Sequence, residues 1–351
     1  MIKGLKMCVG VVLLAAGCRS IGPDTVARDR FDYTTAISDS VKNQLLLNLV
    51  KLRYGDMPLF VDVSSVISQY SLENGIEYNF QWEYPPILRT PSVGGSNTFT
   101  DRPTITYTPL TGDKFSKSIL TPIPPSAIFF LVQSGRSVDS VFFLCVQSIN
   151  GIHNRYDAPM RSRPMDPDFI EVLTRLRRIQ DSSRIGMRIQ TVTNNQSTVM
   201  YFGDKVSPDI AGDIAWVKQK LGLDPQISEY KLVYGSMAQP GEIAILSRSV
   251  MEIMVQLASS IDIPPEDLQQ NRAYAVTATQ ESLAERMRLR VRSGKAKPAD
   301  AYMSIAYRDK WFWIDDTDLQ SKQLFSGILM LLSLMESDKG ANQPVLTVST
   351  G

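Results

Sequence analysis

The chain has 351 residues, with 37 Lys or Arg, 36 Asp or Glu and a formal net charge of +1. This balance lacks the excess positive charge by which proteins attract nucleic acid, so we expect no nucleic-acid partner. A usual zinc site needs several Cys or His ligands, and three cysteines with one histidine are too few to supply them.

The first 17 residues have the pattern of a secretion signal. Lys3 and Lys6 precede the apolar run 7–16, which is shorter than the roughly 20 residues of a membrane-spanning helix. The end of this run continues into Gly17 and Cys18, and the segment Leu14-Ala15-Ala16-Gly17-Cys18 resembles the lipobox of bacterial lipoproteins. This resemblance implies cleavage before Cys18 and acylation of Cys18, so that lipid attaches the chain to a membrane. The alternative is an uncleaved helix with a chance cysteine.

Three further phrases are similar to those of uncharacterised lipoproteins of Gram-negative bacteria. They span residues 50–59, 107–115 and 311–316. The resemblance to these lipoproteins implies no activity and no catalytic residues. Arg19 follows the cysteine in place of the aspartate that retains such lipoproteins in the inner membrane. The resemblance therefore implies an outer-membrane lipoprotein that faces the periplasm.

The composition along the chain predicts four regions. They are a signal peptide at 1–17, a membrane-proximal linker at 18–30, an N-terminal domain at 31–155 and a C-terminal domain at 165–345. The boundary between the domains falls at 151–167, where three prolines occur. We expect an α+β fold with two mixed modules of mainly antiparallel strands packed with helices.

Apolar spacing predicts the elements of the N-terminal domain. A helix is expected over 34–53, followed by extended chain at 59–72. Asn74-Gly75 is a strong hairpin signal, and residues 76–84 then alternate between apolar, mostly aromatic, and polar types. A strand at 104–108 would complete a three-stranded meander. From Gly112 the apolar spacing becomes helical, and this spacing continues through Ile149.

Helices and strands alternate in the C-terminal domain. Asp166 is a plausible N-cap before Pro167, and the helix that follows has a regular apolar face. Strands are expected at 184–190, 197–202, 227–234, 242–246, 273–279 and 286–292. The strands 301–307 and 311–314 form a hairpin, and a final helix covers 319–335.

Few residues indicate catalysis or metal binding. His153 is the single histidine, and no Gly-x-Ser-x-Gly motif accompanies it. Cys145 lies in an apolar run typical of a buried, inert thiol. Asp315, Asp316 and Asp318 precede a helix, where acids stabilise the N-terminus, and they lack the loop of a calcium site. The chain has no phosphate-binding glycine loop, so we predict no nucleotide, metal or other cofactor.

Four arginines alternate along one segment. They are Arg286, Arg288, Arg290 and Arg292, and on a strand they would share one face. Such a face could bind lipid phosphates or an acidic partner. The alternative is a solvated strand edge, where charges prevent aggregation.

These patterns favour a lipid-anchored periplasmic protein of the cell envelope that binds a partner or supports an assembly without catalysis. The membrane and an envelope protein are the expected partners. One alternative is an envelope hydrolase that uses paired carboxylates, which spacing in sequence does not exclude. Another is a small-ligand or lipid-binding module that uses the aromatic face of residues 76–84.

Overall fold

The computed structural model describes residues 23–67, 70–79, 92–101, 104–158, 161–183, 185–192, 195–203, 206–276 and 288–336. These residues form two compact units. Unit 1 contains the described residues up to Val41 together with those of Val61–Pro109, and unit 2 contains Lys42–Phe60 and those from Leu110 onwards. Helices and mainly antiparallel strands confirm the α+β class.

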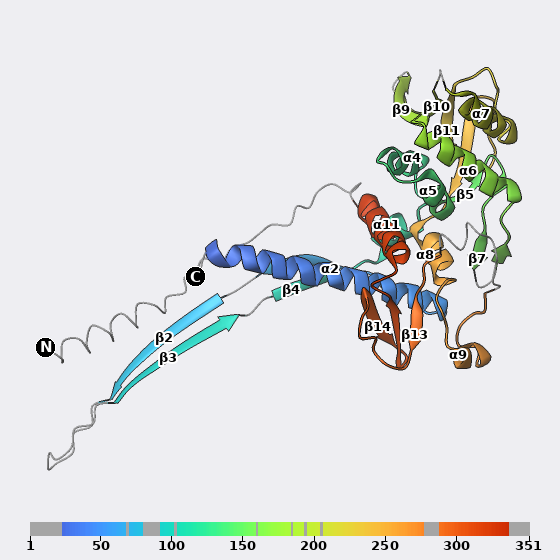
Figure 1. The fold of residues 1–351 in the computed structure, drawn as a ribbon. Coiled ribbons are helices and arrows are strands. Elements are labelled where there is room, and N and C mark those ends of the chain that lie inside the picture. Colours follow the sequence, from blue (N-terminus) through green and yellow to red (C-terminus); the bar gives the residue numbers. More distant parts are fainter. Residues whose placement is uncertain are drawn as a thin grey trace, which may run out of the picture. The chain divides into compact units, whose positions relative to one another are not determined.

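Unit 1 combines the first part of a long helix with four strands (Figure 1). Helix α2 covers Pro23–Arg53, so residues 23–30, expected to be a polar connector, are helical. The strands are β1 (Val61–Ile67), β2 (Tyr70–Asn79), β3 (Ser92–Asp101) and β4 (Thr104–Pro109). β1 pairs with β4 and β2 pairs with β3, both antiparallel. The strands therefore form nested pairs.

The hairpin predicted at Asn74-Gly75 is wrong. Both residues lie inside β2, where Asn74 is opposite Asn97 and Gly75 is opposite Ser96. Residues 92–101, for which no strand was predicted, form β3, despite Gly94-Gly95. A turn signal describes only the local preference of two residues, and pairing along ten residues overrides it. The three-stranded meander is wrong for the same reason.

Unit 2 is built on a six-stranded sheet with the order β6-β5-β12-β11-β10-β9. All neighbours are antiparallel except β11 and β12, which are parallel. The strands are β5 (Val146–Ile149), β6 (Ile152–His153), β9 (Ile185–Val192), β10 (Asn195–Phe202), β11 (Glu229–Tyr234) and β12 (Glu242–Ser247). β5 and β12 come from opposite sides of residues 151–167, so both halves of the chain contribute to this sheet.

Helices pack beside this sheet (Figure 1). They are α4 (Pro125–Gln133), α5 (Val138–Cys145), α6 (Pro167–Asp181) and α7 (Pro208–Lys220). α4 contacts β9 and β11, while α6 contacts β9, β6 and α7. The apolar face predicted for α6 is confirmed, because Phe169, Val172, Leu173, Leu176 and Ile179 are fully buried. Burial of such side chains is the main stabilising contribution to a core of this kind.

The helical spacing that continues to Ile149 overestimates the length of α5. α5 ends at Cys145, and the next four residues form β5 between β12 and β6. The Arg248 guanidinium lies at this end, where Nη1 donates to the carbonyls of Phe143 and Leu144. An arginine more than 100 residues away in sequence thus satisfies the helix terminus, which local spacing cannot show.

The remainder of unit 2 contains a second sheet with the order β13-β15-β14. Its strands are β13 (Arg292–Gly294), β14 (Met303–Tyr307) and β15 (Lys310–Ile314). The predicted hairpin between β14 and β15 is confirmed, with Arg308 and Asp309 at φ 48° and 62° in its turn. The smaller elements and other helices are α3 (Gly112–Phe115), η1 (Ser116–Leu120), β7 (Tyr156–Ala158), β8 (Arg161–Arg163), α8 (Val250–Ala258), α9 (Pro265–Gln269) and α11 (Leu319–Glu336).

Candidate functional site

Large apolar side chains are exposed on two elements of unit 1. On α2, Phe31 is 73% exposed and Val41 43% exposed. On β4, Ile105 is 39% exposed and Tyr107 56% exposed, and all six residues of this strand are exposed. Contiguous patches of exposed apolar side chains are typical of interaction sites, which directs attention to β4.

The strand register places apolar residues together on the β1–β4 pair. Val61 is opposite Pro109 and Val63 is opposite Tyr107, whereas Asp62 is opposite Thr108. Because side chains alternate along a strand, these apolar residues share one face with Ile105. We call Val61, Val63, Ile105 and Tyr107 the ribbon face. A sheet normally buries its apolar face against another layer, so the ribbon face is the candidate binding surface.

A polar network in unit 2 connects the end of α2 to α9 and β15. Asp267 on α9 accepts hydrogen bonds from Tyr54 Oη at 2.6 Å and pairs with Lys310 Nζ at 2.7 Å. Burial alone would raise the pKa of the Asp267 carboxyl, but the hydrogen bonds from Lys310 and Tyr54 lower it overall. Burial, and then the hydrogen bond to Asp267, raises the pKa of the Tyr54 phenol.

This network does not have the properties of a catalytic acid site. A glycosidase requires a carboxylic acid whose pKa is raised, so that it holds a proton near neutral pH. The pKa of Asp267 is shifted in the opposite direction. The nearby Asp56 accepts a hydrogen bond from Tyr307 Oη and pairs with Arg308 at 3.2 Å. Both carboxylates therefore hold together the elements around them.

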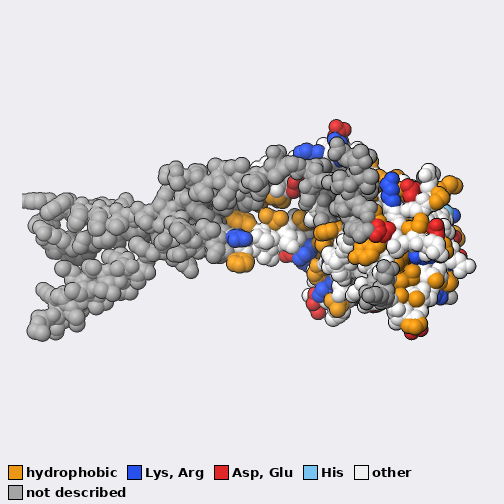
Figure 2. Space-filling model, turned by 90° about the horizontal axis from the view of Figure 1, so that it is seen from above, with side chains coloured by type: hydrophobic (Ala, Val, Ile, Leu, Met, Phe, Trp, Pro, Cys, Tyr) orange, Lys and Arg blue, Asp and Glu red, His pale blue; other side chains and the backbone are white. Residues whose placement is uncertain are grey.

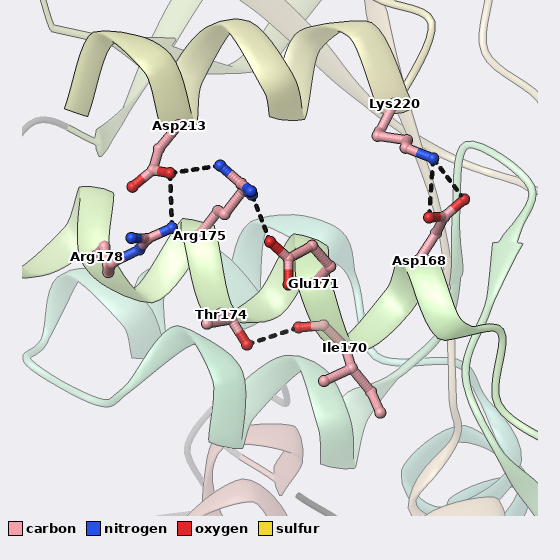
Figure 3. A network of polar contacts seen from close by, with 8 residues as sticks. All are labelled: Asp168, Ile170, Glu171, Thr174, Arg175, Arg178, Asp213 and Lys220. Carbon is pink, nitrogen blue, oxygen red and sulfur yellow. Dashed lines mark hydrogen bonds and ion pairs between the residues drawn. The ribbon is translucent and has the colours of Figure 1, made fainter. Parts of the chain in front are cut away.

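A second network joins α6 to α7 (Figure 3). Asp213 Oδ1 on α7 accepts hydrogen bonds from Arg175 Nη1 at 2.8 Å and Arg178 Nη2 at 2.7 Å. The Arg175 guanidinium also stacks on Trp216, 4.4 Å from the ring centroid. Further along the same helices, Lys220 Nζ pairs with Asp168 at 2.9 Å. These side chains stabilise the packing of two helices.

The predicted arginine face is only partly formed. The strand β13 begins at Arg292, so most of the predicted strand 286–292 is not a strand within the described residues. Arg288, Arg290 and Arg292 are nevertheless exposed, and they alternate with the buried Leu289 and Val291. Arg286 lies outside the described residues.

Acidic partners within the chain lie near Arg288 and Arg292. Arg288 Nη2 lies 3.5 Å from Asp262, and Arg292 Nε lies 2.9 Å from Asp315. Intramolecular pairing lowers the charge that this face offers to an anion. Binding of an anionic partner by Arg286, Arg288, Arg290 and Arg292 stays a prediction.

Of the three acidic residues before α11, Asp318 makes the contact expected at a helix start. Asp318 accepts hydrogen bonds from the backbone and side chain of Ser321, which places it at the helix start. Asp316 pairs with Lys322 at 2.8 Å, and Asp315 pairs with Arg292. Within the described residues, no three His, Cys, Asp or Glu side chains gather as a metal site would require.

The contacts of His153 and the burial of Cys145 both have structural explanations. His153 Nδ1 is 3.5 Å from Asp166 Oδ2, and that carboxylate accepts the His153 backbone N–H. Asp166 precedes α6 as predicted, but its side chain makes no cap hydrogen bond to the helix. Cys145 is fully buried, and burial raises the pKa of its thiol to about 12. The predicted burial of Cys145 is confirmed, and a buried thiol with a raised pKa is a weak nucleophile.

Some predicted features fall outside the part of the chain that the structure describes. They include the signal peptide, the lipobox with Cys18, residues 80–84 of the aromatic run and residues 277–279 of the strand predicted at 273–279. Among the helices of the described ranges, none combines the length and apolar character needed to cross a membrane.

Searches against protein-family models, curated proteins and solved structures found no match. The surface of the described residues in Figure 2 shows acidic and basic side chains interspersed with apolar ones. Such mixing agrees with the near-neutral composition.

The sequence patterns alone did not identify the ribbon face. Residues 104–108 alternate between Thr and apolar residues, which predicts a strand, here the last of the expected meander. The alternation was the correct signal for a strand with one apolar face. What it could not show is that all of β4 is exposed.

Proposed function

We propose that this chain is a lipoprotein of the outer membrane, anchored through acyl groups on Cys18 and facing the periplasm, which binds a partner or supports an assembly without catalysis. The observation that carries the binding role is the exposure of Ile105 and Tyr107 on β4. The surroundings of Asp267, Asp56 and Cys145 support the absence of catalysis, since each has a structural explanation.

The anchor is tested by replacement of Cys18. Cys18→Ser removes the acceptor thiol, so the variant should lose incorporation of labelled palmitate and leave the membrane fraction. Cys8→Ser is the matched control, because Cys8 lies within the expected signal peptide and its loss should change neither result. Membrane retention of Cys18→Ser without label would contradict the anchor.

The binding role is tested by site-specific photo-cross-linking in cells. A photoreactive amino acid at Tyr107 should give reproducible adducts with an envelope protein, because this side chain lies on the ribbon face. Tyr234 of β11 is the matched control, since it is 55% exposed and Tyr107 is 56% exposed. Equal yields of the same adducts at both positions, or none at Tyr107, would contradict a partner at this surface.

A further inference from the structure

The β2–β3 pair has the features of a strand-pairing surface. Each strand has ten residues, and they pair one to one from Tyr70 opposite Asp101 to Asn79 opposite Ser92, without a register shift. Within the described residues, each of the two strands is hydrogen-bonded only to the other. An isolated pair of strands is marginally stable in water, and additional strands are needed to stabilise it.

The β3 edge lacks the usual protection against pairing with another chain. Natural edge strands carry Lys, Pro or a bulge that prevents such contact. Between Ser92 and Asp101 there is no Lys, Arg or Pro, and the register has no bulge. Ser96 and Thr98 are exposed. Among the described residues, no strand pairs with the outer edge of β3, so its backbone groups there can accept a strand of matching length.

We propose that copies of this chain associate side by side, with β3 of one copy pairing with β2 of the next. The distribution of charge favours this choice of strands. β2 contains Glu73 and Glu77, so a contact between two β2 strands would bring four acids together. β3 contains one acid, Asp101, at its last position.

The direction of the strands supports the same arrangement. β2 and β3 are antiparallel within one chain. When two copies lie side by side in the same orientation, β3 of the first copy is therefore antiparallel to β2 of the second. A shared lipid anchor holds all copies in one orientation on the membrane, and this step rests on the proposed function. The contact uses a different edge on each copy, so every pair still has one free β2 and one free β3. We therefore expect more than two copies to associate.

The first experiment removes the pairing strands and keeps the rest of the chain. Ile67 is opposite Thr104 in the β1–β4 register, so replacement of residues 68–103 by Asn-Gly can close a two-residue hairpin there. Light scattering of the detergent-extracted proteins should give the complete chain at least three times the mass of the excised variant. Near-UV circular dichroism checks that unit 2 is unchanged. A monomeric complete chain, or an excised variant that associates equally, would overturn the proposal.

The second experiment does not depend on the excised variant. Two differently tagged copies are expressed together, one with Thr98→Cys and the other with Ser71→Cys, Glu73→Cys or Glu77→Cys, which alternate along β2. A disulfide requires Cα atoms within about 7 Å, so at least one combination should give a mixed-tag dimer. The buried Cys145 is not expected to contribute, and the parent chain without added cysteines measures any background.

The controls separate this contact from chance collisions. Gln219→Cys in both copies tests an exposed position on α7, and it should give less than a tenth of the mixed-tag product. Glu73→Cys in both copies tests pairing of β2 with itself and should give as little. Equal yields from these controls, or a high yield from two Thr98→Cys copies alone, would overturn the assigned strands.

The two proposals fail in distinguishable ways. Loss of the anchor appears as absent acyl labelling at Cys18, whatever the association state. A chain that is acylated and membrane-bound but monomeric would overturn the association alone.

Discussion

At the scale of single residues, two buried charged groups of the described chain, Arg248 and Asp213, have defined partners. Arg248 is 1% exposed, and its guanidinium donates to the carbonyls of Phe143, Leu144 and Arg155. Burial lowers the pKa of Arg248 to about 10. Asp213 is a buried group of the opposite charge. Its side chain is 5% exposed, and its carboxylate pairs with Arg175 and Arg178. Such groups stabilise the fold only while their partners remain.

Removal of the Asp213 carboxylate should therefore destabilise the protein measurably. Asp213→Ala removes the acceptor of two charged hydrogen bonds, while both arginines keep some access to water. We expect the free energy of unfolding in urea to fall by about 1–3 kcal/mol.

Asp168→Ala is the matched control for this prediction. Asp168 pairs with Lys220 between the same two helices, but both side chains are more than a third exposed. Exposed pairs contribute at most about 1 kcal/mol. Equal losses in the two variants would show that burial of Asp213 has no special effect.

At the scale of elements, two helix starts that share a serine at the N-cap differ in their contacts. Ser249 before α8 accepts the backbone N–H of Glu252, and the Glu252 side chain accepts the N–H of Ser249. Ser207 before α7 makes no side-chain cap hydrogen bond. The residue type at a cap thus indicates the helix start, whereas its energetic contribution depends on the contact formed.

Ser249→Ala should lower the free energy of unfolding by about 1 kcal/mol, because it removes a capping hydrogen bond at a buried position. Ser207→Ala should change it by less than about 0.5 kcal/mol. Urea unfolding followed by circular dichroism measures both values. The same loss at both positions would mean that the cap geometry does not decide the effect.

The elements that the sequence predicted well are those determined by local periodicity. The apolar stripe of α6 and the hairpin at Arg308-Asp309 both depend on neighbouring residues. The errors at Asn74-Gly75 and at the end of α5 have a common cause. In each case a distant segment decides the structure: β3 in the first, and Arg248 with β12 in the second.

The candidate surface was predictable only in part, for the same reason. The alternation in β4 predicts an apolar face around Ile105 and Tyr107. Whether another layer covers that face depends on the pairing of β1 with β4, which local sequence does not specify.

At the scale of the whole molecule, unit 2 depends on contacts between segments far apart in sequence. The Asp267 carboxylate joins three such segments, because it contacts both Tyr54 and Lys310. The ring of Tyr54 also lies edge-to-face against Phe312 of β15, 6.0 Å between centroids. Loss of this carboxylate would weaken attachment of the α2 end to α9 and β15 together.

Asp267→Asn should lower the free energy of unfolding by roughly 2–4 kcal/mol near pH 7. The folded pKa of Asp267 lies below that of the unfolded chain, which is about 3.9. Its contribution is therefore present above about pH 4 and is lost as the pH falls through the folded pKa. The difference in stability between wild type and variant should be constant from pH 7 to 5 and decrease below pH 4.

Glu266→Gln provides the control for that pH dependence. Glu266 is adjacent to Asp267 and approaches the same Lys310 Nζ at 3.5 Å, but its side chain is 57% exposed. Its removal should cost less than about 1 kcal/mol, because exposed pairs are screened by water. Urea unfolding of the three proteins at pH 3 to 7 measures both effects. If the Asp267→Asn difference were the same at pH 3 and pH 7, the ionised Asp267 carboxylate would not be what connects these three segments.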